Sequence, residues 1–210
     1  MRVKTKLIII AGPQSSGKTT IMELLEKKYP HIPFIKEINP FTIISKNHLG
    51  GAYVDDETER KITDADIKKI KDINRNQKIV VMETGILHCA YIEYYCGIKA
   101  VQQYLQAYIK AHEGLHPIIF FIDTKPQISW KRRRKNYIQR IHRAGVTDAK
   151  KRKEMLEFYC TRIGNIYHLW HKYYHLIPFE KHMIKNSYKK WEVFEKEIMN
   201  KIKSFLVIPA

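Results

Sequence analysis

Residues 12–19 read Gly-Pro-Gln-Ser-Ser-Gly-Lys-Thr and match the pattern G-x-x-x-x-G-K-[ST] at every position. The run Leu7–Ala11 ahead of them is continuously apolar, which is typical of a buried strand in a parallel sheet. A helical pattern begins at Lys18 and ends before Pro30. Glycines let backbone N–H groups approach phosphate oxygens, and a helix N-terminus directs its positive dipole end at the same anion. The stretch therefore predicts a strand, loop and helix that bind phosphate groups.

Two side chains of this loop have distinct expected roles. Lys18 places a positive charge at the β- and γ-phosphates of ATP, and the Thr19 hydroxyl is positioned to ligate Mg²⁺. ATP and Mg²⁺ are therefore the expected cofactors. The residues expected to surround the phosphates are Gly12, Pro13, Gln14, Ser15, Ser16, Gly17, Lys18, Thr19 and Thr20.

The rest of the chain alternates between strand-like and helical segments. Further strands are expected over 34–38, 78–83, 118–123 and 182–185. The expected fold class is α/β: a P-loop NTPase-type three-layer sandwich with a five-stranded parallel sheet and a helical lid. No repeat or flexible linker interrupts the chain, so we expect a single domain over 1–210. The expected helices are 18–28, 63–74 with a cap at Thr63, 88–112, 126–143, 147–175 and 188–205.

The charge of the chain favours negatively charged partners, although it does not identify one of them. Lys and Arg number 38 against 21 Asp and Glu, and the net charge is +17. Such a surface attracts nucleotides, nucleic acid or acidic membranes, although Lys-rich solvated faces are also common in soluble proteins. No apolar stretch reaches the ~18 residues of a membrane span, and three scattered cysteines without a CxxC pair favour a reducing compartment. We expect a cytoplasmic protein with no membrane partner, and homodimerisation is left open.

Four further segments carry a resemblance. They are 36–40 (Lys-Glu-Ile-Asn-Pro), 80–85 (Val-Val-Met-Glu-Thr-Gly), 121–126 (Phe-Ile-Asp-Thr-Lys-Pro) and 154–159 (Glu-Met-Leu-Glu-Phe-Tyr). In this order after a P-loop, they resemble the deoxynucleoside kinase and thymidylate kinase superfamily. The resemblance implies a kinase whose partner is a nucleoside or nucleotide acceptor.

Two glutamates lie at the carboxyl ends of predicted strands, where the functional groups of open α/β sheets gather. The resemblance implies that Glu37 is the base near the acceptor hydroxyl; an exposed or helix-capping glutamate is the alternative. Glu83 is placed to orient Mg²⁺ through water, as a Walker-B acid does. The family has an arginine after this acid, whereas this chain has Thr84. The contact made by that arginine is therefore missing or supplied elsewhere.

The segment 126–150 resembles the lid that closes over ATP. Arg132, within a basic run, matches the first lid arginine of the family, and the second is Arg140 or Arg143. A planar guanidinium can stabilise charge on phosphoryl oxygens through paired hydrogen bonds. A solvated basic helix face is the alternative interpretation.

The predicted function is an ATP-dependent phosphotransferase acting on a nucleoside or a nucleoside monophosphate. The alternative is a polynucleotide 5′-kinase or another nucleic-acid-associated P-loop ATPase, which would hold nucleic acid on its basic surface. The chain length favours the first function, because little sequence remains for a separate nucleic-acid domain and no nucleic-acid-binding motif is recognisable.

Overall fold

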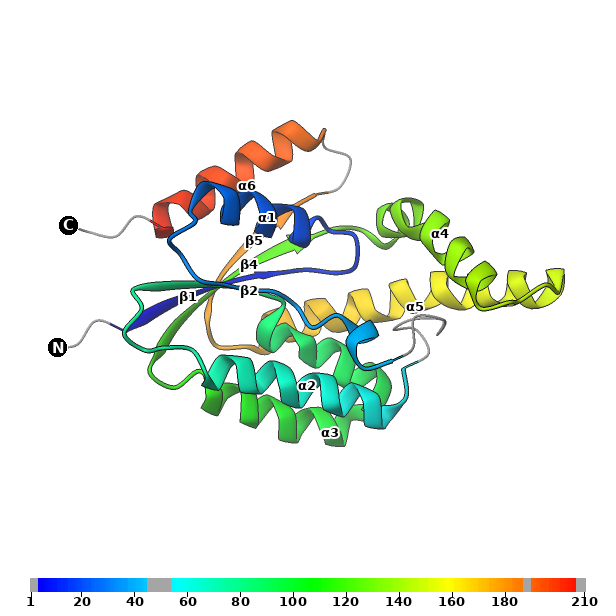
Figure 1. The fold of residues 1–210 in the computed structure, drawn as a ribbon, viewed down its shortest axis with the longest axis horizontal. Helices are drawn as coiled ribbons and strands as arrows, with labels where there is room; N and C mark the ends of the chain where they lie inside the picture. The colour runs from blue at the N-terminus through cyan, green and yellow to red at the C-terminus, as the bar shows by residue number, and fades with distance from the viewer. Residues whose placement is uncertain (1–3, 45–53, 187–189, 207–210) are drawn as a thin grey trace.

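A single sheet of parallel strands forms the centre of the molecule (Figure 1). Its strand order is β2-β3-β1-β4-β5. β1 (Thr5–Ala11) lies between β3 (Ile79–Glu83) and β4 (Leu115–Asp123), while β2 (Phe34–Ile35) and β5 (Glu180–Lys185) form the edges. The computed structural model describes residues 4–44, 54–186 and 190–206.

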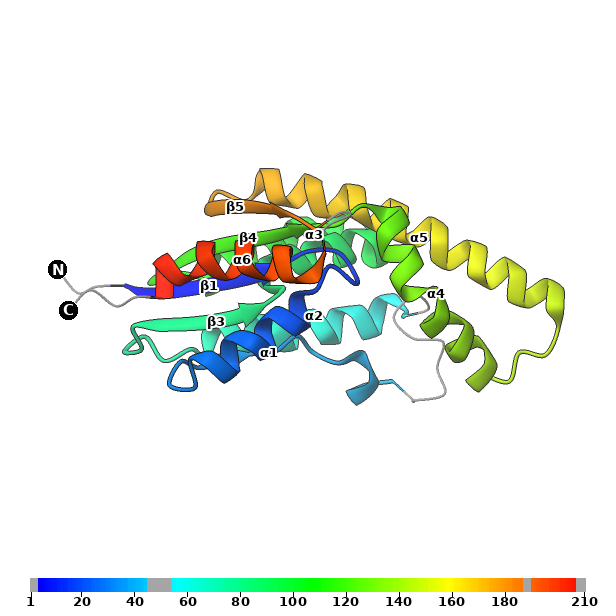
Figure 2. The ribbon, with the colours of Figure 1, turned by 90° about the horizontal axis from the view of Figure 1, so that it is seen from above.

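Helices cover both faces of the sheet (Figures 1 and 2). Leu7 and Ile9 of β1 pack toward one helical layer, and Ile8 and Ile10 pack toward the other, as the two-residue period of a strand requires. These contacts confirm the predicted three-layer α/β sandwich with five parallel strands. The first layer contains α2 (Asp56–Lys71), α3 (Cys89–Ala111) and part of α5 (Ala149–Leu176), and the second contains α1 (Lys18–Lys28) and α6 (Trp191–Leu206).

The segment expected to form the lid lies beyond the carboxyl ends of the strands. α4 (Pro126–Arg143) and the first half of α5 extend away from the strands in both views (Figures 1 and 2). They share a small core of their own, in which the rings of Tyr137 and Tyr159 stack with centroids 4.0 Å apart. The lid therefore packs largely on itself rather than on the sheet.

The prediction of a helix over 63–74 with a cap at Thr63 was wrong at its start. α2 begins seven residues earlier, because the Asp55 side chain caps it by accepting a hydrogen bond from the Thr58 backbone N–H (2.7 Å). Thr63 lies inside the helix, where its hydroxyl donates to the Glu59 carbonyl (2.9 Å). A residue type that favours caps is thus accommodated within a helix by a local hydrogen bond.

Smaller differences concern element boundaries. β2 ends at Ile35 rather than at residue 38. The expected helix over 88–112 begins one residue later, after the 3-10 turn η3 (Gly85–His88), and is interrupted at Gly97, where φ is +81°. The described part of the last helix begins at Trp191, and residues 188–189 of its expected range lie outside the described residues. None of the described helices combines the length and the apolar character needed to cross a membrane.

Candidate active site

The P-loop closes around the amine of its own lysine. Lys18 Nζ donates to the carbonyl oxygen of Gly12 (3.0 Å), and Lys18 is buried. Gly12 has φ +153°, and a Cβ there would lie 2.5 Å from the carbonyl oxygen of Ile122. Asn186, after β5, supports the loop by donating from Nδ2 to the Ser16 carbonyl (2.7 Å). The amine therefore lies within the loop, where a phosphate oxygen could replace the carbonyl as its acceptor.

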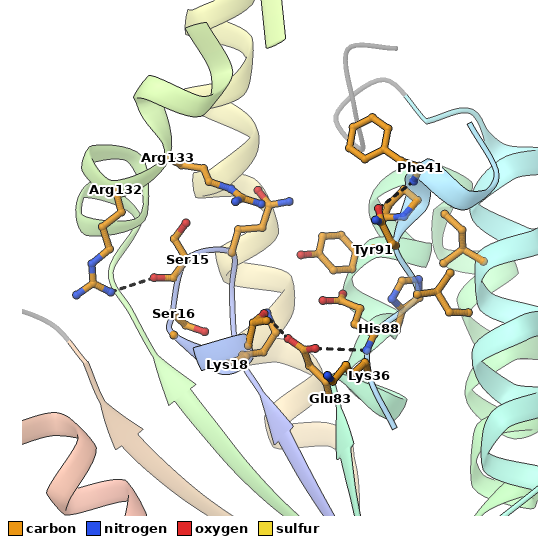
Figure 3. A pocket seen from close by; sticks show the side chains of 18 of the residues that line it. Ser15, Ser16, Lys18, Lys36, Phe41, Glu83, His88, Tyr91, Arg132 and Arg133 are labelled. Carbon is orange, nitrogen blue, oxygen red and sulfur yellow. Dashed lines mark hydrogen bonds between the residues drawn. The ribbon is translucent and has the colours of Figure 1, made fainter. Parts of the chain in front are cut away.

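The two predicted metal-binding residues are in contact. The Thr19 hydroxyl, in the first turn of α1, donates to Oε1 of Glu83 at the end of β3 (2.8 Å). Glu83 is buried, and its second oxygen, Oε2, accepts from the Glu37 backbone N–H (3.3 Å; Figure 3). A hydroxyl and a carboxylate are hard oxygen donors of the kind that Mg²⁺ prefers. Thr19 and Glu83 therefore fit a magnesium site beside the P-loop.

Glu37 follows β2 and lies half-buried in the wall of a cavity that also contains the P-loop and Glu83. It does not cap the 3-10 turn η1 (Pro40–Thr42), because the Asn39 side chain accepts the capping hydrogen bond from the Phe41 N–H (3.1 Å). Its neighbour Lys36 instead pairs with Glu26 of α1 (2.8 Å). The structure thus places the Glu37 residue beside Glu83 and in the cavity, which removes the capping alternative.

One cavity of about 870 Å³ begins at the P-loop and continues toward α2 and α3. Glu37 and Glu83 line its middle, and Phe41, Ile62 and Tyr91 line its far part. Figure 3 shows Ser15 and Arg132 on one side of this space, with Phe41, Tyr91 and His88 on the other. Volumes of this order suit small-molecule ligands, and the aromatic far part suits a planar ring.

The arginines of the expected lid contact different parts of the site. Arg132 Nη1 donates to the carbonyl oxygen of Ser15 in the P-loop (2.9 Å). Arg140 lines the cavity, with its guanidinium 5.4 Å from the ring centroid of Phe41, and burial lowers the pKa of its side chain. Arg143 is exposed and lies outside the described cavity lining. Of the two alternatives for the second lid arginine, the geometry therefore favours Arg140.

Arg162 of α5 lines the cavity and was missed by sequence reasoning. It is 2% exposed, its Nε donates to the Tyr95 hydroxyl (2.7 Å), and its Nη1 donates to Oε1 of Gln14 in the P-loop (3.2 Å). The sequence does contain a signal that could have identified Arg162. Arg162 falls within the buried stripe of α5 that runs from Met155 to Trp170, where an apolar residue is expected.

A buried pair of opposite charges also lines the cavity. No pattern in the sequence indicated this pair. His88 Nε2 lies 2.7 Å from Oε1 of Glu59, and both side chains are almost fully buried. Burial lowers the pKa of His88, but the Glu59 carboxylate and then the Asp66 carboxylate outweigh it and raise the pKa to about 9. His88 is therefore protonated at neutral pH. Its partner lies on a different element, α2, which sequence spacing could not reveal.

This sheet order, with a P-loop after β1 and a lid between β4 and β5, is the P-loop nucleotide-kinase fold. Solved structures share it at low identity. YorR of Bacillus subtilis, solved with phosphorylated GDP, has a TM-score of 0.57 and 14% identity, covering 97% of this chain and 100% of that one. Thymidylate kinase of Candida albicans has a TM-score of 0.58 and 15% identity, covering 98% of this chain and 94% of that one. Deoxyadenosine kinase of M. mycoides has a TM-score of 0.58 and 18% identity, covering 94% of this chain and 99% of that one.

The family is given by a separate comparison. A family model described as an AAA domain matches residues 7–169, which is most of the chain, so the chain belongs to that family. The match includes the P-loop, Glu83 and the lid helix α4. No significantly similar sequence was found among curated proteins.

Proposed function

We propose that the protein is a P-loop phosphotransferase that uses ATP and Mg²⁺ to phosphorylate a nucleoside or a nucleoside monophosphate. The observation that carries this proposal is the continuity of one cavity from the P-loop, past Glu37 and Glu83, to an aromatic chamber lined by Phe41 and Tyr91. Phosphoryl transfer needs donor and acceptor in line within one water-poor space. A single cavity that joins the P-loop to Phe41 and Tyr91 supports such an arrangement.

On the donor side, the loop amides and the Lys18 amine hold the triphosphate. Thr19 and Glu83, which are already hydrogen-bonded to one another, would hold Mg²⁺ through hard oxygen atoms. When bound, Mg²⁺ would neutralise part of the negative charge of the phosphate groups. Glu83 thus serves to orient the donor end of the reaction.

On the acceptor side, Glu37 takes the proton where the acceptor is a hydroxyl. Arg132 and Arg140 donate hydrogen bonds to the migrating phosphoryl group when the lid over 126–150 closes. The contact between Arg132 and the Ser15 carbonyl supports this role, because it puts a guanidinium at the mouth of the loop.

The net charge of +17 favours one further candidate, a polynucleotide 5′-kinase. Its acceptor would be the 5′-hydroxyl of an oligonucleotide laid over the basic surface. The two candidates share the donor site and differ only in what enters the far part of the cavity.

A transfer assay with γ-labelled ATP tests the proposal. Wild-type protein should label a nucleoside or a monophosphate from a panel of both. Lys18→Ala should lower the rate on the order of 10²-fold or more, because one transition-state cation is lost. Its thermal unfolding midpoint should stay close to wild type. Unchanged turnover in folded Lys18→Ala protein would contradict a P-loop mechanism.

A further inference from the structure

Much of the positive charge of the chain is concentrated in one segment. Residues 126–153 contain 11 of the 38 Lys and Arg residues, and Asp148 is the one acidic residue among them. This segment therefore contributes +10 to the net charge of +17. It forms α4 and the beginning of α5, which extend away from the strands (Figures 1 and 2). Charge that serves only solubility is expected on all faces of a protein, so this concentration needs a separate explanation.

The proposed transfer uses only part of this charge. Arg132, Arg133 and Arg140 line the cavity. The other cations of the segment are all exposed and lie outside the described cavity lining. We call them the hairpin surface, which consists of Lys131, Arg134, Lys135, Arg143, Lys150, Lys151, Arg152 and Lys153. The binding and transfer of a phosphoryl group in the cavity therefore do not account for the hairpin surface.

On α4, the exposed cations lie along one face of the helix. Lys131, Arg134 and Lys135 are spaced by three and four residues, and the exposed side chains of Ile138 and His142 continue the same stripe. The buried side chains that pack against α5 lie on a different face. From residue 131 to residue 142 the helix rises by about 17 Å, which is the axial length of roughly five base pairs of duplex DNA. The stripe is therefore longer than a single phosphate group requires.

The beginning of α5 adds cations at a place where a helix does not favour them. Residues 150–153 read Lys-Lys-Arg-Lys and follow Ala149, the first residue of the helix. The helix dipole has its positive end there, so acidic residues would stabilise this turn and basic residues do not. Among the described residues, the one ion pair of this run joins Lys153 to Glu157 at 4.0 Å, and exposed pairs of this kind stabilise little. A bound polyanion would relieve the repulsion among these charges, and local arrangements that disfavour folding are expected at functional sites.

We propose that the hairpin surface binds the phosphate backbone of a nucleic acid, as a docking site separate from the cavity in which phosphoryl transfer is proposed. This inference goes beyond the proposed function and does not depend on it. Cations spread along a helix match a chain of regularly spaced phosphates, and contacts to backbone phosphates carry no sequence information. Binding at this surface is therefore independent of sequence.

An acidic membrane fits the hairpin surface less well than a nucleic acid does. A helix that lies on a membrane presents a continuous apolar face to the lipid. The buried apolar side chains of α4, such as Tyr137 and Ile141, pack instead against α5. On the exposed stripe, Ile138 is 43% exposed and is surrounded by cations. The surface thus offers charge for phosphates and little apolar area for lipid.

Fluorescence anisotropy tests the inference, with labelled duplex DNA and labelled single-stranded RNA of mixed sequence as probes. Two triple variants each remove part of the hairpin surface: Lys131→Gln/Arg134→Gln/Lys135→Gln and Lys151→Gln/Arg152→Gln/Lys153→Gln. At ~150 mM salt, wild-type protein should bind at least one of the probes, and each variant should bind it about 10-fold more weakly or worse. The slope of log affinity against log salt should fall by about 2 to 3 in each variant, because up to three phosphate contacts are lost.

The control is Lys71→Gln/Lys196→Gln/Lys203→Gln, which removes the same charge from exposed positions of α2 and α6. Its salt slope should fall by less than about 1, because these lysines lie outside the proposed surface. Thermal unfolding midpoints verify that the variants fold. The variant at 151–153 should be at least as stable as wild type, because it removes repulsion at the start of α5.

Four results would overturn the inference. The first is the absence of binding of both probes at ~150 mM salt. The second is an equal loss in the control, since binding would then follow net charge alone. The third is displacement of the probe by saturating MgATP at constant ionic strength, which would place the strand in the cavity. The fourth is tighter binding to vesicles of phosphatidylcholine and phosphatidylserine at the same concentration of negative charge, which would identify a membrane surface as the partner.

Discussion

Glu83 lies buried at the end of β3, and its two carboxylate oxygens have different partners. One oxygen accepts from the Thr19 hydroxyl and the other from the Glu37 backbone N–H. A buried carboxylate is stabilised by such hydrogen bonds. The contact to the Glu37 N–H also holds the backbone at Glu37, so that the Glu37 side chain stays beside the donor site. The positions of these two acids are thus coupled.

Replacing Glu37 by Gln should lower turnover far more than it lowers ATP affinity, by an expected ~10²-fold in kcat for a hydroxyl acceptor. The amide keeps the shape and the backbone contact to Glu83, but it removes the negative charge. Steady-state kinetics give kcat, and calorimetry gives the ATP affinity. Glu57→Gln, at an exposed glutamate of α2, is the matched control. A variant that loses ATP affinity alone would show that Glu37 does not lie beside the acceptor.

The pair of His88 and Glu59 should make stability depend on pH. The pKa of His88 is raised to about 9 in the folded protein by Glu59 and Asp66, from 6.5 when exposed. The folded state therefore holds a proton that the unfolded state loses between these values. The stabilisation is complete below pH 6.5 and is lost as pH rises through about 9, and it amounts to about 3 kcal/mol at most.

Urea unfolding at pH 6.5 and pH 9.5 measures this effect. Wild-type protein should lose more unfolding free energy across this interval than His88→Gln protein, because the variant lacks the titrating ring. Comparing the two proteins removes the contribution of groups that titrate in both. Equal losses in the two proteins would mean that His88 is not held protonated by Glu59.

At the scale of elements, α4 and α5 form a unit with its own small core and few ties to the P-loop. The Tyr137 hydroxyl donates to Oε1 of Gln14 (2.7 Å), and Arg132 Nη1 donates to the Ser15 carbonyl (2.9 Å). Gln14 Oε1 also accepts from Arg162, so both lid helices meet at one P-loop side chain. A ligand at the loop can therefore act on both helices at once.

We expect the region 126–150 to exchange its amide hydrogens faster without ligand than with ATP and acceptor. Its basic residues repel one another until phosphates arrive, and closure then excludes water from the transfer. Hydrogen exchange in the absence and presence of a bisubstrate analogue measures this difference, with the helix α6 as an internal reference. Equal protection of 126–150 in both states would identify a static basic helix.

The elements that were predictable from sequence are those with a local signal. The β1 run, the P-loop and α1 follow from continuous apolar residues, glycines and helical spacing, and the structure has them within two residues of the predicted bounds. The start of α2 was missed because Asp55 and Thr63 both favour helix caps, and only the fold decides between them. Local patterns thus locate elements better than they locate ends.

The residues of the candidate site also divide into those with a local sequence signal and those without one. Thr19 follows β1 through the P-loop and Glu83 ends β3, so the neighbouring parallel strands bring them together, as their sequence positions suggested. Arg162, by contrast, meets Gln14 across 148 positions of chain and Tyr95 across 67. Such contacts depend on how α5 packs against α3, which no local spacing encodes.

At the scale of the whole molecule, the net charge of +17 makes some binding of oligonucleotides at low salt unavoidable. Binding alone therefore does not distinguish a small-molecule kinase from a polynucleotide kinase. The cavity is a better guide, because Phe41, Ile62 and Tyr91 line it together with the P-loop. A single nucleotide fits such a space more readily than the end of a long strand.

The acceptor should consequently be a small molecule at physiological ionic strength. With γ-labelled ATP at ~150 mM salt, where long-range attraction is largely screened, label should appear on a nucleoside or monophosphate and not on 5′-hydroxyl oligonucleotides. The oligonucleotides should bind at low salt with a steep salt dependence, because each phosphate contact releases counterions. Lys18→Ala protein shows which label depends on the P-loop, since its surface charge away from the cavity is unchanged. Label on oligonucleotides, lost in Lys18→Ala protein, with none on any small acceptor, would establish the polynucleotide kinase instead. The part of the cavity beside Tyr91 would then have to admit a strand end, and competition by free mononucleotides would measure whether it does.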